Sequence, residues 1–91
     1  MTELQFTQEN ERYVSNAITA SEVTVHLKFA QPSSLIVERT ADESHGWAPV
    51  ATRSQFGDGL FEESIVGIPE GVKVRINASS MPTLAQCLIV E

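Results

Sequence analysis

The sequence predicts an all-β protein: a single small antiparallel β-sandwich or barrel of about seven to eight short strands, Ig-like or jelly-roll-like. Apolar residues occupy every second position from Val23 to Phe29, and the same period returns from Val72 to Ala78. A period of two places alternate side chains on one face of a sheet, which is typical of half-buried strands. Turn residues recur roughly every eight to twelve positions, as in sandwiches and barrels. No helical stripe of convincing length interrupts this pattern.

The first part of the chain is expected to form three strands before a turn. Leu4–Gln8 is short enough to be an edge strand. Arg12–Ala20 could be placed on a helical wheel, but its β-branched residues favour a strand. Glu22–Phe29 shows the clearest alternation. Gln31–Ser34 is expected to be a turn, because Pro32 fixes φ and the serines offer local hydrogen bonds.

The second part of the chain is expected to add five strands, joined by polar or glycine-containing turns. Asp42–Gly46 is a polar hairpin loop, and the two glycines in 57–59 can supply positive φ. Pro69-Glu70-Gly71 is a turn that proline opens and glycine closes. The expected strands are Leu35–Thr40, Trp47–Ser54, Leu60–Ile68, Val72–Ala78 and Leu84–Val90.

Length and charge limit the classes of function. Ninety-one residues form one domain, which spans residues 1–91. The net charge is −6 and the six basic residues are spread along the chain. This disfavours binding to nucleic acid or to an anionic membrane, since phosphate contacts need clustered Lys and Arg. Met1-Thr2-Glu3 lacks the basic start and the following apolar run of a signal peptide, so we expect synthesis in the cytoplasm.

Side chains that carry chemistry form no recognisable constellation in the sequence. His26 and His45 are expected at the surface, and with the single Cys87 they fall short of a zinc ligand set. Cys87 is expected to be a small buried hydrophobe. Glu62 and Glu63 are adjacent, so in a strand they point to opposite faces and cannot form a catalytic pair. We therefore expect no enzymatic activity, no metal and no cofactor.

The hairpin around Trp47 allows two interpretations. Glu38–Asp42 followed by Gly46–Val50 resembles the hairpin of discoidin-type carbohydrate-binding sandwiches, in which a tryptophan anchors the strand after a glycine turn. That resemblance implies a small lectin-like module in which Trp47, with Asp42 and His45 in the loop, contacts a sugar. In the other interpretation, Trp47 packs in the core or against the end of a sheet and holds the two strands together.

Three parts of the chain resemble small structural proteins from the virions of tailed bacteriophages and prophages of gut bacteria. They are the opening strands (Leu4–Phe6, Glu11–Ser15 and Val23–Leu27), the hairpin (Val37–Thr40 and Gly46–Val50) and the closing segment (Ile68–Ile76 and Met81–Leu84). The resemblance implies a β-sandwich of the auxiliary or decoration type, which binds the outer surface of a phage capsid and stabilises it. It leaves the position in head, neck or tail open, and it supplies no catalytic residues.

The virion interpretation sets the expected partner and contact residues. The partner would be the major capsid protein or another virion protein, and the location would be the capsid surface. Self-association is a second possible source of stability, because a core this small gains from docking. Phe56 and Phe61 flank the 57–59 turn and could lie either at the interface or in the core. The residues expected to contact the partner are Asp42, Glu43, His45, Trp47, Phe56 and Phe61.

Overall fold

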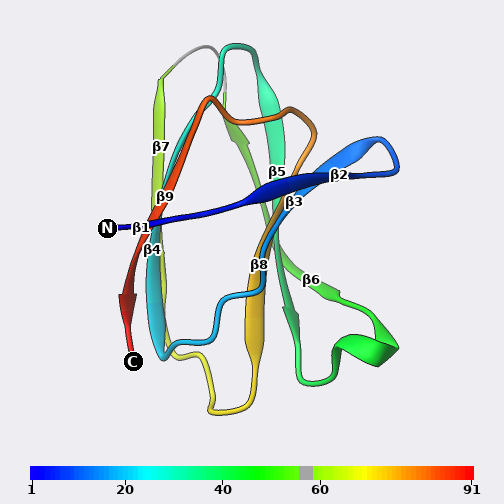
Figure 1. The fold of residues 1–91 in the computed structure, drawn as a ribbon, viewed down its shortest axis with the longest axis vertical. Helices are drawn as coiled ribbons and strands as arrows, with labels where there is room; N and C mark the ends of the chain where they lie inside the picture. Colours follow the sequence, from blue (N-terminus) through cyan, green and yellow to red (C-terminus); the bar gives the residue numbers. More distant parts are fainter. Residues whose placement is uncertain (56–58) are drawn as a thin grey trace.

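Two antiparallel sheets pack face to face in the computed structural model of the protein, which describes residues 1–55 and 59–91 (Figure 1). This confirms the predicted all-β sandwich. In sheet order, the four-stranded sheet contains β1 (Thr2–Glu3), β9 (Leu84–Val90), β4 (Glu22–Lys28) and β7 (Leu60–Ile65). The five-stranded sheet contains β2 (Phe6–Glu9), β3 (Arg12–Ser15), β8 (Lys73–Ala78), β5 (Ser33–Thr40) and β6 (Ala48–Gln55).

The strand order is that of a jelly roll. β1 and β2 together form the first strand of this arrangement, and the strand pairings that follow are antiparallel. From β3 to β5 the chain alternates between the two sheets, β5 and β6 form a hairpin, and β7, β8 and β9 alternate again. A jelly roll built in this way leaves only short sheet edges, because strands from both ends of the chain pair with one another.

The chain changes sheets near its start, where one strand over Leu4–Gln8 was predicted. This prediction was wrong, because β1 pairs with β9 and β2 pairs with β3. At the crossing point the Leu4 N–H donates to the Ala85 carbonyl at 3.0 Å, and the Gln5 carbonyl accepts from the Asn16 N–H at 2.9 Å. Both sheets are thus joined along this side by a continuous piece of backbone.

Two other predicted strands are shorter in the structure by several residues. The strand predicted over Arg12–Ala20 ends at Ser15. The Ser15 hydroxyl accepts a hydrogen bond from the Ile76 N–H at 2.9 Å, and this bond takes the place of the next backbone hydrogen bond between β3 and β8. Ile18 makes only an isolated bridge to Val74. Leu60–Ile68 ends at Ile65, before Gly67 with φ 65°. Conversely, β5 begins within the predicted turn, since Ser33 and Ser34 both pair with β6.

The core lies between the two sheets and confirms the predicted alternation. In β4, Val23, Val25 and Leu27 are at most 1% exposed. In β8, Val74 and Ile76 are equally buried. The remaining apolar core residues are Leu4, Phe6, Ile18, Phe29, Leu35, Val37, Ile65, Ile68, Ala78 and Cys87. Cys87 therefore occupies the buried position predicted for it. Among the described residues, no helix is long and apolar enough to cross a bilayer.

Candidate functional site

Four of the six predicted contact residues gather on the connection between β5 and β6. This connection contains the short 3-10 helix η1 (Glu43–His45), preceded by Asp42 and followed closely by Trp47. Phe61 lies elsewhere, on β7 opposite Leu27, and is partly buried against the core. Figure 1 places the start of β7 at the other end of the sandwich from the η1 loop. Phe56 lies outside the described residues.

Asp42 holds the η1 loop in one shape. Its Oδ1 accepts the Ser44 N–H at 3.0 Å and the Ser44 hydroxyl at 2.6 Å, so Asp42 is the N-cap of η1. These two hydrogen bonds stabilise the carboxylate and lower the pKa of Asp42. His45 Nδ1 lies 3.3 Å from Asp42 Oδ2. Gly46 ends the turn with φ 94°, a conformation that favours glycine.

Two contacts anchor the loop to the five-stranded sheet. Glu43 Oε2 lies 2.8 Å from the Nζ of Lys73 at the start of β8. The guanidinium of Arg75, two residues further along β8, lies 4.5 Å from the centre of the Trp47 ring. This cation–π contact covers one face of the indole. Trp47 is therefore half-buried over the outside of the sheet, not in the core.

A polar network on the outer face of the five-stranded sheet supports Trp47. Glu38 is only 8% exposed, although it points outwards, and its Oε1 accepts from Arg75 Nε at 2.8 Å. The same oxygen accepts from Asn77 Nδ2 at 3.4 Å, and the Asn77 side-chain oxygen accepts from Arg12. These anchors were not predicted from the sequence. The sequence does show that Glu38 and Arg75 occupy the alternate, polar positions of their strands. Only the register between β5 and β8 shows that they lie opposite each other.

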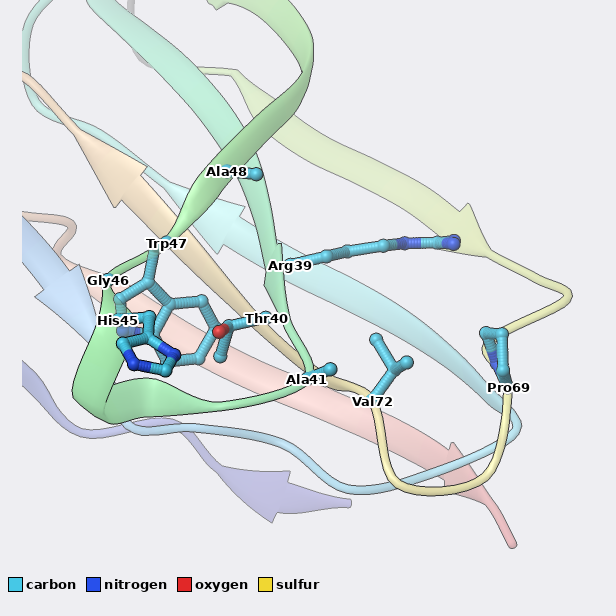
Figure 2. A pocket seen from close by; sticks show the side chains of 9 residues that line it. All are labelled: Arg39, Thr40, Ala41, His45, Gly46, Trp47, Ala48, Pro69 and Val72. Carbon is cyan, nitrogen blue, oxygen red and sulfur yellow. The ribbon is translucent and has the colours of Figure 1, made fainter.

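A groove of about 460 Å³ opens beside the loop (Figure 2). The His45 and Trp47 side chains lie on its loop side, and Pro69 and Val72 lie on the turn before β8. Arg39 extends between them toward the end of β7, where its Nη2 donates to the Val66 carbonyl at 3.3 Å. The remaining wall is small or apolar, so the groove offers an aromatic edge, an imidazole and few fixed charges.

In the described part of the chain, no group of three or more His, Cys, Asp or Glu side chains could hold a metal ion. Glu62 and Glu63 point to opposite faces of the sheet, as predicted. On the outer face, Glu62 Oε2 lies 2.8 Å from His26 Nδ1. On the other face, Glu63 Oε1 lies 2.8 Å from Arg53 Nε of β6. The expected surface position of His26 needs correction, since its side chain is only 13% exposed. The reason is its place on the central strand β4, where the paired strands on both sides flank it.

Comparison with family models, with curated proteins and with solved structures found no significant match to this chain.

Proposed function

We propose that the protein is a virion structural protein, an auxiliary or decoration protein that binds the outer surface of a phage capsid and stabilises it. The proposal draws on the resemblance of the opening strands, the central hairpin and the closing segment to such proteins. A jelly roll is also an architecture that viral capsid proteins use. Because one fold hosts many functions, this second argument is an analogy. The function must therefore be argued from the site.

The observation that carries the proposal is the pre-organised η1 loop. Asp42, Glu43 and His45 are exposed at the end of the sandwich, yet each is tied to a neighbour by a hydrogen bond or an ion pair. Trp47 is fixed by Arg75. A surface that is already rigid loses little conformational entropy when it binds, so more of its contact energy appears as affinity. Such a surface suits docking onto a preformed shell.

Co-sedimentation with capsids tests the proposal. Purified protein is mixed with assembled capsids of the source phage and, separately, with unassembled major capsid protein. We expect the chain to sediment with intact capsids and not to bind isolated subunits. Failure to sediment with capsids would contradict capsid binding, and counting copies per major capsid protein in purified virions would separate head from neck or tail. Hundreds of copies indicate the head, and a handful indicates the neck or tail.

Matched variants locate the contact. The double variant Glu43→Ala and His45→Ala removes two exposed side chains of the loop and should weaken sedimentation with capsids. The control Gln8→Ala and Glu11→Ala changes two exposed residues at the β2–β3 hairpin and should sediment like the parent. Equal binding by both variants would move the docking surface away from the η1 loop.

Sugar binding is the second candidate function, and the groove beside Trp47 favours it. Arg75 covers one face of the indole, so only its remaining surface and the His45 ring are available to a sugar. A glycan array and the shift of the Trp47 indole N–H signal on addition of hits test this function. An array without hits above background would leave the capsid proposal alone.

A further inference from the structure

The outer face of the four-stranded sheet is unlike the rest of the surface. We call it the β4 face, since β4 runs along its centre. Its side chains alternate with the buried ones of β9, β4 and β7. They are Leu84, Gln86, Leu88 and Val90 from β9; Glu22, Thr24, His26 and Lys28 from β4; and Leu60, Glu62 and Ser64 from β7.

Most of the exposed large apolar side chains that the structure describes lie on this face. Leu60, Leu88 and Val90 are 51%, 49% and 51% exposed. Met1 and Val66 extend the outward phase of β1 and β7 by one residue and are also exposed. The outer face of the five-stranded sheet is instead covered by its own polar network. A concentration of apolar side chains on one face indicates a surface that contacts another protein.

The register arranges these side chains in rows across the sheet. Val90 stands beside Glu22 in the first row, and Leu84, Lys28 and Leu60 form the last row. The two rows between them contain Thr24 beside Ser64 and His26 beside Glu62, whose carboxylate lies 2.8 Å from His26 Nδ1. The only charged side chains of β4 are therefore an acid at one end and a base at the other. In residues 1–55 and 59–91, neither Glu22 nor Lys28 forms an ion pair.

We propose that the β4 face binds the β4 face of a second copy, across a two-fold axis that lies in the interface and runs perpendicular to the strands. This rotation keeps each strand above its own copy and reverses the order of the rows. Glu22 of each copy then meets Lys28 of the other. Leu84 meets Val90, and Leu60 meets Val66, so apolar side chains also face apolar side chains. The interface is isologous, as in most closed dimers.

The charges at the two ends of β4 favour this axis over the alternative. An axis parallel to the strands would keep the row order, and Glu22 would face Glu22 while Lys28 would face Lys28. Like charges opposite each other disfavour that complex. A net charge of −6 per chain adds general repulsion between copies. The local attraction between Glu22 and Lys28 would offset part of this repulsion. Face-to-face sheets pack about 10 Å apart, a gap that these two long side chains can span.

The size of the face predicts a weak dimer. Three strands about 4.8 Å apart, with about 3.4 Å of rise per residue, present roughly 350 Å² in projection on each copy. This is well below the roughly 800 Å² per partner of a standard specific interface and is in the range of weak, transient contacts. We expect a monomer–dimer equilibrium in the micromolar range or weaker. The inference concerns self-association only and does not depend on capsid binding.

Sedimentation equilibrium of the full chain, with charge-swap variants, tests the inference. The parent should show concentration-dependent dimerisation. Glu22→Lys and Lys28→Glu should each weaken the dimer by about fivefold to tenfold, since each places like charges at both symmetric contacts. The double variant Glu22→Lys with Lys28→Glu exchanges the two charges and should restore the dimer to within about threefold of the parent. All variants are checked by circular dichroism for the parent β spectrum.

Glu11→Lys is the matched control, because it changes the net charge as much as Glu22→Lys but lies at the tip of the β2–β3 hairpin. It should leave the dimer intact or strengthen it by reducing the overall repulsion. A parent that stays monomeric at all concentrations would overturn the inference. So would single variants that dimerise like the parent, or a double variant without rescue. Equal weakening by Glu11→Lys would show that the loss is not specific to the β4 face and would overturn it as well.

Discussion

The residue that sets the shape of the η1 loop is Asp42, whose exposed carboxylate caps the helix through Ser44. These hydrogen bonds hold the pKa of Asp42 below the ordinary aspartate value of about 3.9. Because the folded-state pKa is lowered, the cap is fully formed above pH about 4 and is lost as the pH falls through the lowered pKa. We expect the Ser44 amide signal in an NMR titration to move only in that acidic window.

Asp42→Asn is the control for this titration. Asparagine keeps an oxygen acceptor for Ser44 but has no proton to gain, so the movement of the Ser44 amide signal should disappear. The neutral acceptor makes a weaker hydrogen bond than the carboxylate. A carboxyl group of Asp42 that titrates at the ordinary value or above it would contradict the capping role.

Cys87 is the corresponding residue inside the sandwich. It is 1% exposed, and removal from water raises the pKa of its thiol. A thiol reagent should therefore label Cys87 only when the protein unfolds. Because the folded-state pKa is raised, the thiol's contribution to stability is full below the unfolded pKa of about 8.5 and is lost as the pH rises through the raised folded pKa.

Urea unfolding between about pH 7 and pH 10 measures this contribution, with Cys87→Ala as the reference. The parent should lose stability relative to Cys87→Ala toward the alkaline end. Rapid labelling of the native parent at neutral pH would contradict the buried position.

At the scale of elements, the outer face of the five-stranded sheet depends on one ion pair. The Glu38 and Arg75 side chains are 10% and 14% exposed and meet at 2.8 Å. Arg75→Met leaves a buried carboxylate without its nearest cation, and we expect a loss of about 3 to 5 kcal/mol in the free energy of unfolding. The double variant Glu38→Leu with Arg75→Met removes both charges and should recover most of that loss.

Chemical denaturation of the parent, both single variants and the double variant completes this cycle. Recovery in the double variant identifies pairing as the cause of the loss. A double variant as unstable as Arg75→Met would indicate that the contact of Arg75 with Trp47, rather than its pairing with Glu38, stabilises the sheet.

The same elements show how far the sequence could predict the structure. The alternation in Glu22–Phe29 and Val72–Ala78 identified two central strands, because each has one fully buried face and one more polar face that is only partly buried. Strand ends were less predictable, since Ser15 ends β3 through a hydrogen bond to Ile76 that is 61 residues away in the chain. The four contact residues of the η1 loop could be grouped from the sequence, because they are close together in the chain. The contact of Trp47 with Arg75 could not be predicted, because it depends on the register between β5 and β8.

At the scale of the whole molecule, the two outer surfaces differ in how their side chains are satisfied. The five-stranded sheet covers its outer face with Glu38, Arg75 and their neighbours, and it carries the η1 loop. The four-stranded sheet leaves leucine and valine side chains exposed. A dimer through the β4 face would keep both η1 loops free, so the proposed self-association and the proposed capsid docking would use separate surfaces and would not exclude each other.

The jelly-roll topology also predicts that the two sheets unfold together. The backbone crosses between the sheets at Leu4, whose side chain is 5% exposed and whose N–H bonds to Ala85 near the other end of the chain. Leu4→Ala should cost about 2 to 4 kcal/mol, because it opens a cavity at the point that joins the sheets. The control Leu88→Ala removes the same atoms from a side chain that is 49% exposed and should cost less than about 1 kcal/mol.

Two probes follow the sheets separately in urea. Fluorescence of the single tryptophan, Trp47, reports on the five-stranded sheet, and labelling of Cys87 reports on the four-stranded sheet. The measurements are made on dilute protein, so that loss of Leu88 acts on the monomer alone. In the parent and in both variants the two midpoints should coincide, and in Leu4→Ala both should fall together, as in two-state unfolding. If only the Cys87 midpoint fell in Leu4→Ala, the crossing backbone would not couple the sheets, and each sheet would unfold as a unit of its own.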